Sequence, residues 1–175
     1  MSILFSDIRE FTATSEKLSP EQIFKFINDY LEIMVPIVQK NNGFVDKFIG
    51  DAIMAIFPET ADNAINCALK MQSAIPEVNA KISEYLDQEL EIGVGINTGV
   101  VRLGTLGALE RMEGSVISDA VNLAARVEQL TKKYLENIIV TEFTKMAASN
   151  FNFNELDVVK VKGKSNSVKI YGVSF

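Results

Sequence analysis

Two aspartates stand at the ends of short apolar runs, and they are the strongest candidates for chemistry in this chain. Asp7 follows residues 3–6 (ILFS), and Asp51 follows residues 48–50 (FIG). A carboxylate is costly to desolvate, so two of them beside strand-like apolar segments indicate a bound cation. At a separation of about 4 Å they would repel each other by about 4 kcal/mol at an effective dielectric of about 20. We therefore predict a divalent metal site, provided that the fold brings Asp7 and Asp51 together.

Asp51 and Lys47 each fit a simpler interpretation as well. Gly50-Asp51 is an ordinary hairpin turn sequence, so Asp51 alone also fits a turn residue. Lys47 alternates with Val45 and Ile49 on one face of a predicted strand. It fits either a lysine at the edge of a sheet or a donor that recognises a ligand in a half-buried pocket.

The predicted helix that begins after Ser118 carries a second candidate pair. Asn122 and Arg126 are four residues apart and therefore project from the same face of the helix. A solvated polar face explains this pair, and so does recognition of a phosphate and a sugar, because the planar fork of arginine matches phosphoryl oxygens.

Glycines provide two weaker signals. Residues 161–164 (VKGK) place two lysines around a glycine, which fits either a phosphate cradle or a turn between the last strands. Gly93, Gly95 and Gly99 are not followed by a Gly-Lys-Ser/Thr sequence, so a Walker-type loop is absent. Bulges or close backbone packing explain these three glycines better.

Composition limits the remaining possibilities. The chain has no histidine and one cysteine, Cys67, so a structural zinc site and an internal disulfide are excluded, and a reducing compartment is expected. The net charge of -6 and the lack of a basic stripe argue against nucleic-acid binding. No apolar run approaches the roughly 18 residues of a membrane span, and no signal peptide is visible, so we expect a cytoplasmic protein. Chemistry must then use carboxylates, hydroxyls, lysine, arginine and hard metals such as Mg²⁺ or Mn²⁺.

The periodicity of apolar residues predicts one α+β domain over residues 1–175, with the ferredoxin-like order βαββαβ followed by additional α and β elements. The helices should cover one face of a mainly antiparallel sheet, and residues 105–113 should form an arm. The predicted strands cover residues 2–8, 44–49, 52–57, 91–97, 99–104, 138–141, 157–162 and 168–175, with 91–97 and 99–104 as a pair. The predicted helices cover residues 20–41, 61–86 with a break or bend at Pro76, 118–133 and 142–148.

Together, four segments resemble the catalytic domain of class III nucleotide cyclases. Residues 5–12 and 46–52 resemble the two metal motifs of that family. Residues 115–126 resemble its transition-state segment, and 161–164 its phosphate-contacting element. The segments occur in the order of the family and span nearly the whole chain, so the resemblance implies the nucleotide cyclase fold.

The resemblance implies a role for each residue of the metal and base sites. Asp7 and Asp51, with the backbone carbonyl of Ile8, would hold two Mg²⁺ or Mn²⁺ ions per site. Lys47 would contact the adenine edge, which favours ATP because the guanylate-specific branch has an acidic residue there. Ser115 takes the second base-recognition position, where relatives have Thr or Asp.

The resemblance also implies an activity and an assembly. Asn122 would orient the ribose, Arg126 would stabilise the phosphates in the transition state, and Lys162 would contact the terminal phosphates. The expected reaction is the conversion of ATP to 3′,5′-cyclic AMP and pyrophosphate by an adenylate cyclase. The family geometry implies a homodimer with two shared sites, in which residues 105–113 form the dimerisation arm. An upstream regulatory or sensor domain, membrane-attached in some relatives, would belong to the full-length protein. The alternatives are a guanylate cyclase and a non-catalytic cyclase-like partner.

Overall fold

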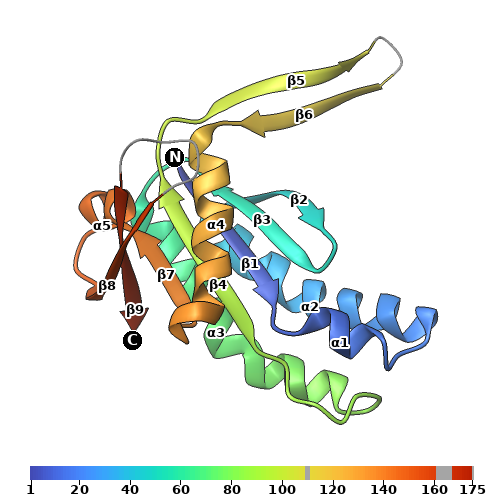
Figure 1. The fold of residues 1–175 in the computed structure, drawn as a ribbon. Helices are drawn as coiled ribbons and strands as arrows, with labels where there is room; N and C mark the ends of the chain where they lie inside the picture. The colour runs from blue at the N-terminus through green and yellow to red at the C-terminus, as the bar shows by residue number, and fades with distance from the viewer. Residues whose placement is uncertain (109–110, 161–166, 175) are drawn as a thin grey trace.

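The computed structural model describes residues 1–108, 111–160 and 167–174, and within them a seven-stranded sheet forms the centre of the fold (Figure 1). The β4–β7 pair is parallel and the other neighbours in the sheet are antiparallel, as predicted. In order across the sheet, the strands are β2 (Phe44–Ile49), β3 (Ala52–Phe57), β1 (Ser2–Ile8), β4 (Ile92–Thr98), β7 (Ile138–Thr141), β9 (Ser167–Ser174) and β8 (Asn152–Lys160).

Helices cover both faces of this sheet, so the prediction of a single covered face was wrong. α2 (Pro20–Lys40) and α3 (Ala61–Ile82) pack on one face, and α4 (Asp119–Tyr134) packs on the other (Figure 1). The physical reason lies in β3, where residues 53–57 (IMAIF) are all apolar and all buried. Side chains alternate between the two faces of a strand, so a strand that is apolar throughout needs cover on both sides.

The remaining described elements are two short helices and a separate two-stranded ribbon. α1 (Phe11–Ser15) follows β1, and α5 (Glu142–Ala147) follows β7. β5 (Arg102–Ala108) and β6 (Arg111–Ile117) pair only with each other and extend away from the sheet (Figure 1). Both edges of β4 are already occupied by β1 and β7. The predicted pairing of residues 99–104 with 91–97 is therefore wrong, and 102–104 belong to the ribbon.

Two other predicted boundaries differ from the structure. β8 begins at Asn152 rather than Asp157, because this edge strand exposes most of its side chains and carries a weak apolar pattern. α3 continues through Pro76 to Ile82 as one helix.

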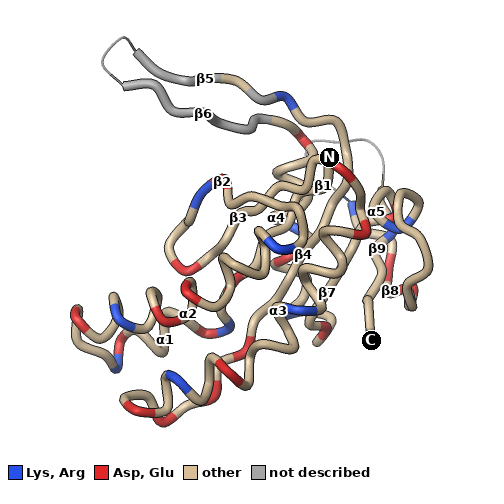
Figure 2. Tube along the Cα trace, turned by 180° about the vertical axis from the view of Figure 1, so that it is seen from behind, with Lys and Arg blue, Asp and Glu red and all other residues tan. Residues whose placement is uncertain are grey.

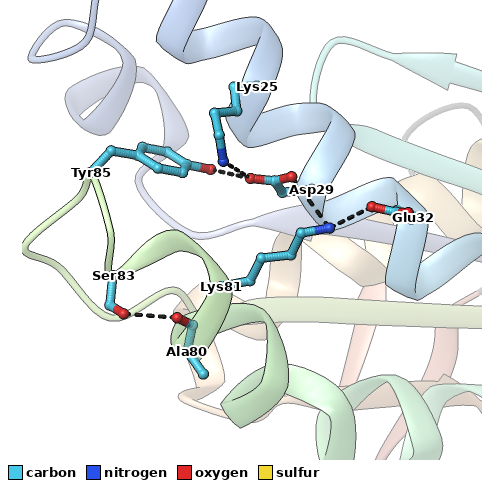
Figure 3. A network of polar contacts seen from close by, with 7 residues as sticks. All are labelled: Lys25, Asp29, Glu32, Ala80, Lys81, Ser83 and Tyr85. Atoms are coloured by element: carbon cyan, nitrogen blue, oxygen red, sulfur yellow. Dashed lines mark hydrogen bonds and ion pairs between the residues drawn. The ribbon is translucent and has the colours of Figure 1, made fainter.

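A buried aspartate joins α2 to the end of α3 (Figure 3). Asp29 accepts hydrogen bonds from Lys25 Nζ at 2.7 Å and from Tyr85 Oη at 2.8 Å, and Lys81 Nζ lies 3.3 Å from its other oxygen. Lys81 also pairs with Glu32. Burial alone would raise the pKa of Asp29, but these donors together hold it below its usual value. The network fixes the two helices that cover one face of the sheet.

Candidate active site

The structure brings Asp7 and Asp51 together at one end of the sheet. β1 and β3 are antiparallel neighbours, with Ser6 opposite Ile53, so the end of β1 meets the turn before β3. Gly50 makes this turn with a positive φ of 63°, a conformation that favours glycine. The backbone N–H of Ile8 donates a hydrogen bond to Asp51 Oδ2 at 3.1 Å. Asp7 and Asp51 are far apart in the sequence, but the fold places them close together.

The electrostatics of this pair fit a divalent cation. Burial and the neighbouring Asp7 carboxyl raise the pKa of Asp51 to about 7. Two carboxylates that cannot both ionise at low cost form a site for a hard divalent ion, because the ion supplies the missing positive charge. Among the described residues, no group of three or more Asp, Glu, Cys or His side chains is arranged for metal binding. Further ligands would have to come from backbone carbonyls, water or substrate.

A β-bulge in β2 turns Lys47 to the face of the sheet opposite to the one that the sequence pattern predicts. Val45 pairs with Ala55, whereas Lys47 pairs with Met54, so Asp46 is an extra residue in β2. Ala55 and Met54 are consecutive in β3 and therefore face opposite sides of the sheet. Paired residues face the same side, so Val45 and Lys47 also lie on opposite faces. The prediction that these two share a face was wrong, because a period of two does not anticipate an inserted residue.

The bulge places Lys47 on the face that α4 covers. Its neighbour on β3, Met54, packs with Phe5 and Ala124 in the apolar cluster of that face. Lys47 Nζ lies 3.3 Å from Asp46 Oδ2, and the Lys47 side chain is 40% exposed. Lys47 therefore has both solvent access and a position on the same side of the sheet as α4.

Asn122 and Arg126 lie on α4, as predicted. Ser118 caps the helix by accepting a hydrogen bond from the N–H of Val121 at 3.4 Å. Asn122 is exposed, and Arg126 is half-buried in a hollow of about 300 Å³ that Lys160 of β8 also lines.

Arg126 lies on the opposite flank of α4 from the aspartates. Ala120 and Ala124 pack on β1 and β3, whereas Leu123 and Val127 pack on β7 and β9. Arg126 follows the second flank, toward β8. Within one chain, the structure therefore does not bring Arg126 to the Asp7–Asp51 pair.

Of the two remaining predicted site residues, the structure describes the backbone of Ser115 and does not describe Lys162. Ser115 lies on β6, where its backbone pairs with Gly104 in the ribbon, but its side chain lies outside the described part of the structure. Lys162 lies outside the described residues altogether. The roles of both stay predictions.

The whole chain matches one protein family. A model of the adenylate and guanylate cyclase catalytic domain matches residues 1–174. The chain belongs to this family. The predicted resemblance to nucleotide cyclases is thereby confirmed.

Several named relatives resemble this cyclase domain in sequence. It is 44% identical over 182 residues to the terminal-differentiation specific adenylate cyclase of Dictyostelium discoideum, covering 99% of the chain and 8% of that protein. It is 42% identical over 182 residues to an adenylate cyclase of Anabaena cylindrica, covering 99% of the chain and 36% of that protein. The chain thus spans well under half the length of both relatives.

Solved structures of a guanylyl cyclase and of an adenylyl cyclase match the cyclase domain equally well. The guanylyl cyclase Cya2 superposes with a TM-score of 0.90 at 35% identity, over 98% of this chain and 90% of the other. The adenylyl cyclase CyaB from P. aeruginosa also has a TM-score of 0.90, at 31% identity, over 99% and 93% of the two chains. The α+β cyclase fold is therefore confirmed.

Two residues of the cyclase domain that the sequence reasoning missed lie beside Asp7. Lys132 Nζ is 3.7 Å from Asp7 Oδ2. Glu128 is buried, and burial together with the Asp7 carboxylate raises its pKa to about 7. The available signal was spacing, because Glu128 and Lys132 are four residues apart on the helix that carries Ala124 against β1.

Proposed function

We propose that this domain is an adenylate cyclase that converts ATP to 3′,5′-cyclic AMP and pyrophosphate. The observation that carries the proposal is the pairing of Asp7 and Asp51 beside the N–H of Ile8. Two like charges in a partly desolvated place are costly unless the site serves a cation. Membership of the cyclase family and the similarity to named adenylate cyclases support the same reaction.

Asp7, Asp51 and the carbonyl of Ile8 would hold two Mg²⁺ or Mn²⁺ ions. When bound, such ions lower the pKa of the ribose 3′-hydroxyl and neutralise the triphosphate. The chain itself supplies position and charge. Asn122 would orient the ribose so that the 3′-oxygen lies in line with the α-phosphorus and the leaving pyrophosphate. Arg126 would place its guanidinium where negative charge develops, and Lys162 would bind the terminal phosphates.

The active site would be completed by a second copy of the chain. Asp7 lies on the side of α4 that packs on β1 and β3, whereas Arg126 lies on the side toward β8, so we expect each protomer to contribute only one of the two to a given site. In a two-fold dimer, each chain would supply the metal aspartates to one site and Lys47, Asn122, Arg126 and Lys162 to the other. The ribbon formed by β5 and β6 extends away from the sheet and would act as the dimerisation arm (Figure 1). Many of the Asp and Glu residues lie on and around α2 and α3 (Figure 2).

Lys47 supports ATP as the substrate. An ammonium donates to the N1 acceptor of adenine, whereas the corresponding edge of guanine presents N–H donors, which a carboxylate would accept. A guanylate cyclase is the second candidate, because the guanylyl cyclase Cya2 matches the fold as well as an adenylyl cyclase does. A partner subunit without catalysis of its own is the third, and any turnover by the isolated chain argues against it.

We place the site in the cytosol, where ATP is available and Cys67 stays reduced. No helix among the described residues combines the length and the apolar composition that crossing a bilayer requires. Because the sequence relatives are much longer, an upstream sensor or regulatory domain in the full-length protein is part of the proposal.

The proposal is tested by identifying the product after the purified chain is incubated with ATP or GTP and with Mg²⁺ or Mn²⁺. Cyclic AMP formed faster from ATP than cyclic GTP from GTP is the expected result. Preferential formation of cyclic GTP would assign the guanylate activity. No cyclic nucleotide under any combination, from a chain shown to dimerise, would contradict catalysis.

A further inference from the structure

A buried glutamate on α4 has no part in the chemistry described so far. Glu128 is 6% exposed. Its Oε1 atom is fully buried, and among the described residues it has no hydrogen-bond partner. A buried acceptor without a donor costs free energy, so its place in the fold calls for a function.

Glu128 lies beside Asp7, on the same face of the sheet. Asp7 is directly opposite Gly93 in the antiparallel β1–β4 pair, and paired residues point their side chains to the same face. A Cβ atom added to Gly93 would lie 3.1 Å from Glu128 Oε1 and 2.3 Å from Thr131 Oγ1. The Thr131 hydroxyl and the Glu128 carboxyl therefore fill the space that a side chain next to Asp7 would otherwise occupy.

The position of Glu128 is fixed by close contact between α4 and β4. A Cβ atom added to Gly95 would lie 2.1 Å from the backbone nitrogen of Glu128, so only glycine allows the helix to come this near. This contact fixes the backbone of Glu128 and therefore the point from which its carboxyl extends. On the same flank, Lys132 extends to Asp7 from a side chain that is 52% exposed.

We propose that Glu128 is a positioning residue of the metal site, whose carboxyl accepts a hydrogen bond from the water shell of the divalent ion at Asp7 and Asp51 and strengthens binding of that ion. This inference rests on the proposed function, which places the metal at those two aspartates. Glu128 is not a third direct ligand, since no such group of three is arranged among the described residues. Groups that orient a metal from outside its ligand shell typically change affinity by 10–100-fold.

The test is Mn²⁺ binding by the purified chain without nucleotide, followed as free Mn²⁺ by electron paramagnetic resonance. Glu128→Gln keeps the shape of the side chain and removes its charge. We expect Mn²⁺ to bind at least about tenfold more weakly, with no loss of thermal stability in the metal-free chain. Glu91→Gln is the matched control, because it removes a carboxylate that is 71% exposed and paired with Arg9. This control should leave Mn²⁺ affinity within about twofold of wild type.

Asp51→Asn separates failure of the inference from failure of the proposed function. If Asp51→Asn loses Mn²⁺ while Glu128→Gln binds like wild type, only the role of Glu128 is overturned. If Asp51→Asn binds like wild type, or if wild type binds no Mn²⁺, the metal site itself is overturned, and the inference with it. Should Glu128→Gln not fold, the ¹³C signal of the Glu128 carboxyl in wild type decides. Movement of that signal in step with added Mg²⁺ supports the role, and no movement overturns it.

Discussion

The backbone N–H of Ile8 donates to the carboxylate of Asp51, 43 residues further along the chain, at 3.1 Å. This hydrogen bond ties the end of β1 to the turn between β2 and β3, and it holds Asp51 beside Asp7. A backbone donor partly offsets the cost of the buried carboxylate, but the neighbouring charge still raises its pKa to about 7. The metal-free site is therefore held in place and electrostatically unfavourable.

Replacing Asp51 by Asn should separate stability from activity. The Asn side-chain oxygen still accepts from the Ile8 N–H, and the repulsion with Asp7 is gone. The thermal midpoint of the metal-free variant at pH 8 should therefore equal or exceed that of wild type, while cyclase activity falls by at least about a hundredfold. Calorimetry and product formation measure the two effects. Normal Mg²⁺-dependent turnover by this variant would refute the metal assignment.

The stability of the metal-free chain should decrease as the pH rises from about 4 to about 7. In this range the folded chain keeps a proton on Asp51 that the unfolded chain has lost, because burial and Asp7 raise its pKa. The folded state then binds more protons than the unfolded state, so the free energy of unfolding falls with increasing pH. Glu128 acts in the same direction.

Urea unfolding at a series of pH values without divalent ions measures this slope. Asp51→Asn should make it shallower, and Mg²⁺ should stabilise wild type more at pH 8 than at pH 5, because protons compete with the ion. A rise in stability of the metal-free wild type between pH 5 and 7, with a slope that Asp51→Asn leaves unchanged, would contradict the pairing.

Lys47→Glu combined with Ser115→Cys should shift substrate preference toward GTP. The exchange replaces a donor by an acceptor at the position turned toward the α4 face by the bulge at Asp46. Rejection of a mispaired hydrogen-bonding group is strong, so we expect the ratio of kcat/KM for ATP and GTP to change by about a hundredfold or more. Lys47→Gln is a milder control. Unchanged preference for ATP in the double variant would remove Lys47 from base recognition.

Asp29→Ala should destabilise the domain without touching the site. It leaves the ammonium groups of Lys25 and Lys81 and the hydroxyl of Tyr85 without their shared acceptor (Figure 3). The expected loss is about 1–3 kcal/mol in the free energy of unfolding. Lys25→Met is the control and should cost less, because that side chain is 51% exposed. Equal stabilities of wild type and Asp29→Ala in urea would show that the network is not stabilising.

The elements with local signals were predicted from the sequence. The helix predicted over residues 20–41 is α2, which a capping box of Ser19 and Gln22 starts, and Gly50-Asp51 forms the hairpin turn. Gly95 is explained by close backbone packing, as expected, because the α4 backbone at Glu128 lies over it, whereas Gly93 makes room for the side chains of Thr131 and Glu128. In each case the residues that determine the structure are neighbours in sequence or glycines at a close approach.

What the sequence did not predict depends on contacts between distant segments. The bulge at Asp46 turns Lys47 because of how β2 pairs with β3, and no periodicity of β2 reveals the extra residue. An arm was predicted over residues 105–113, but the extension of its strands to residues 102 and 117 was not, because it depends on β4 being paired on both edges. Glu128 looked like one charge of an ordinary helix, and only the packing of α4 on β4 shows that it is buried beside Asp7.

Mixing two inactive variants tests most directly whether two protomers share the active site at Asp7 and Asp51. Asp7→Ala and Arg126→Ala each disable both sites of a homodimer, but a mixed dimer contains one site with an intact aspartate pair and an intact arginine. If the two variants are mixed in equal amounts and their chains exchange freely, half of the dimers are mixed. Each mixed dimer has one of its two sites intact, so about a quarter of wild-type cyclic AMP formation should return. No recovery, with mixed dimers demonstrated by affinity tags on the two chains, would contradict a site built from two protomers.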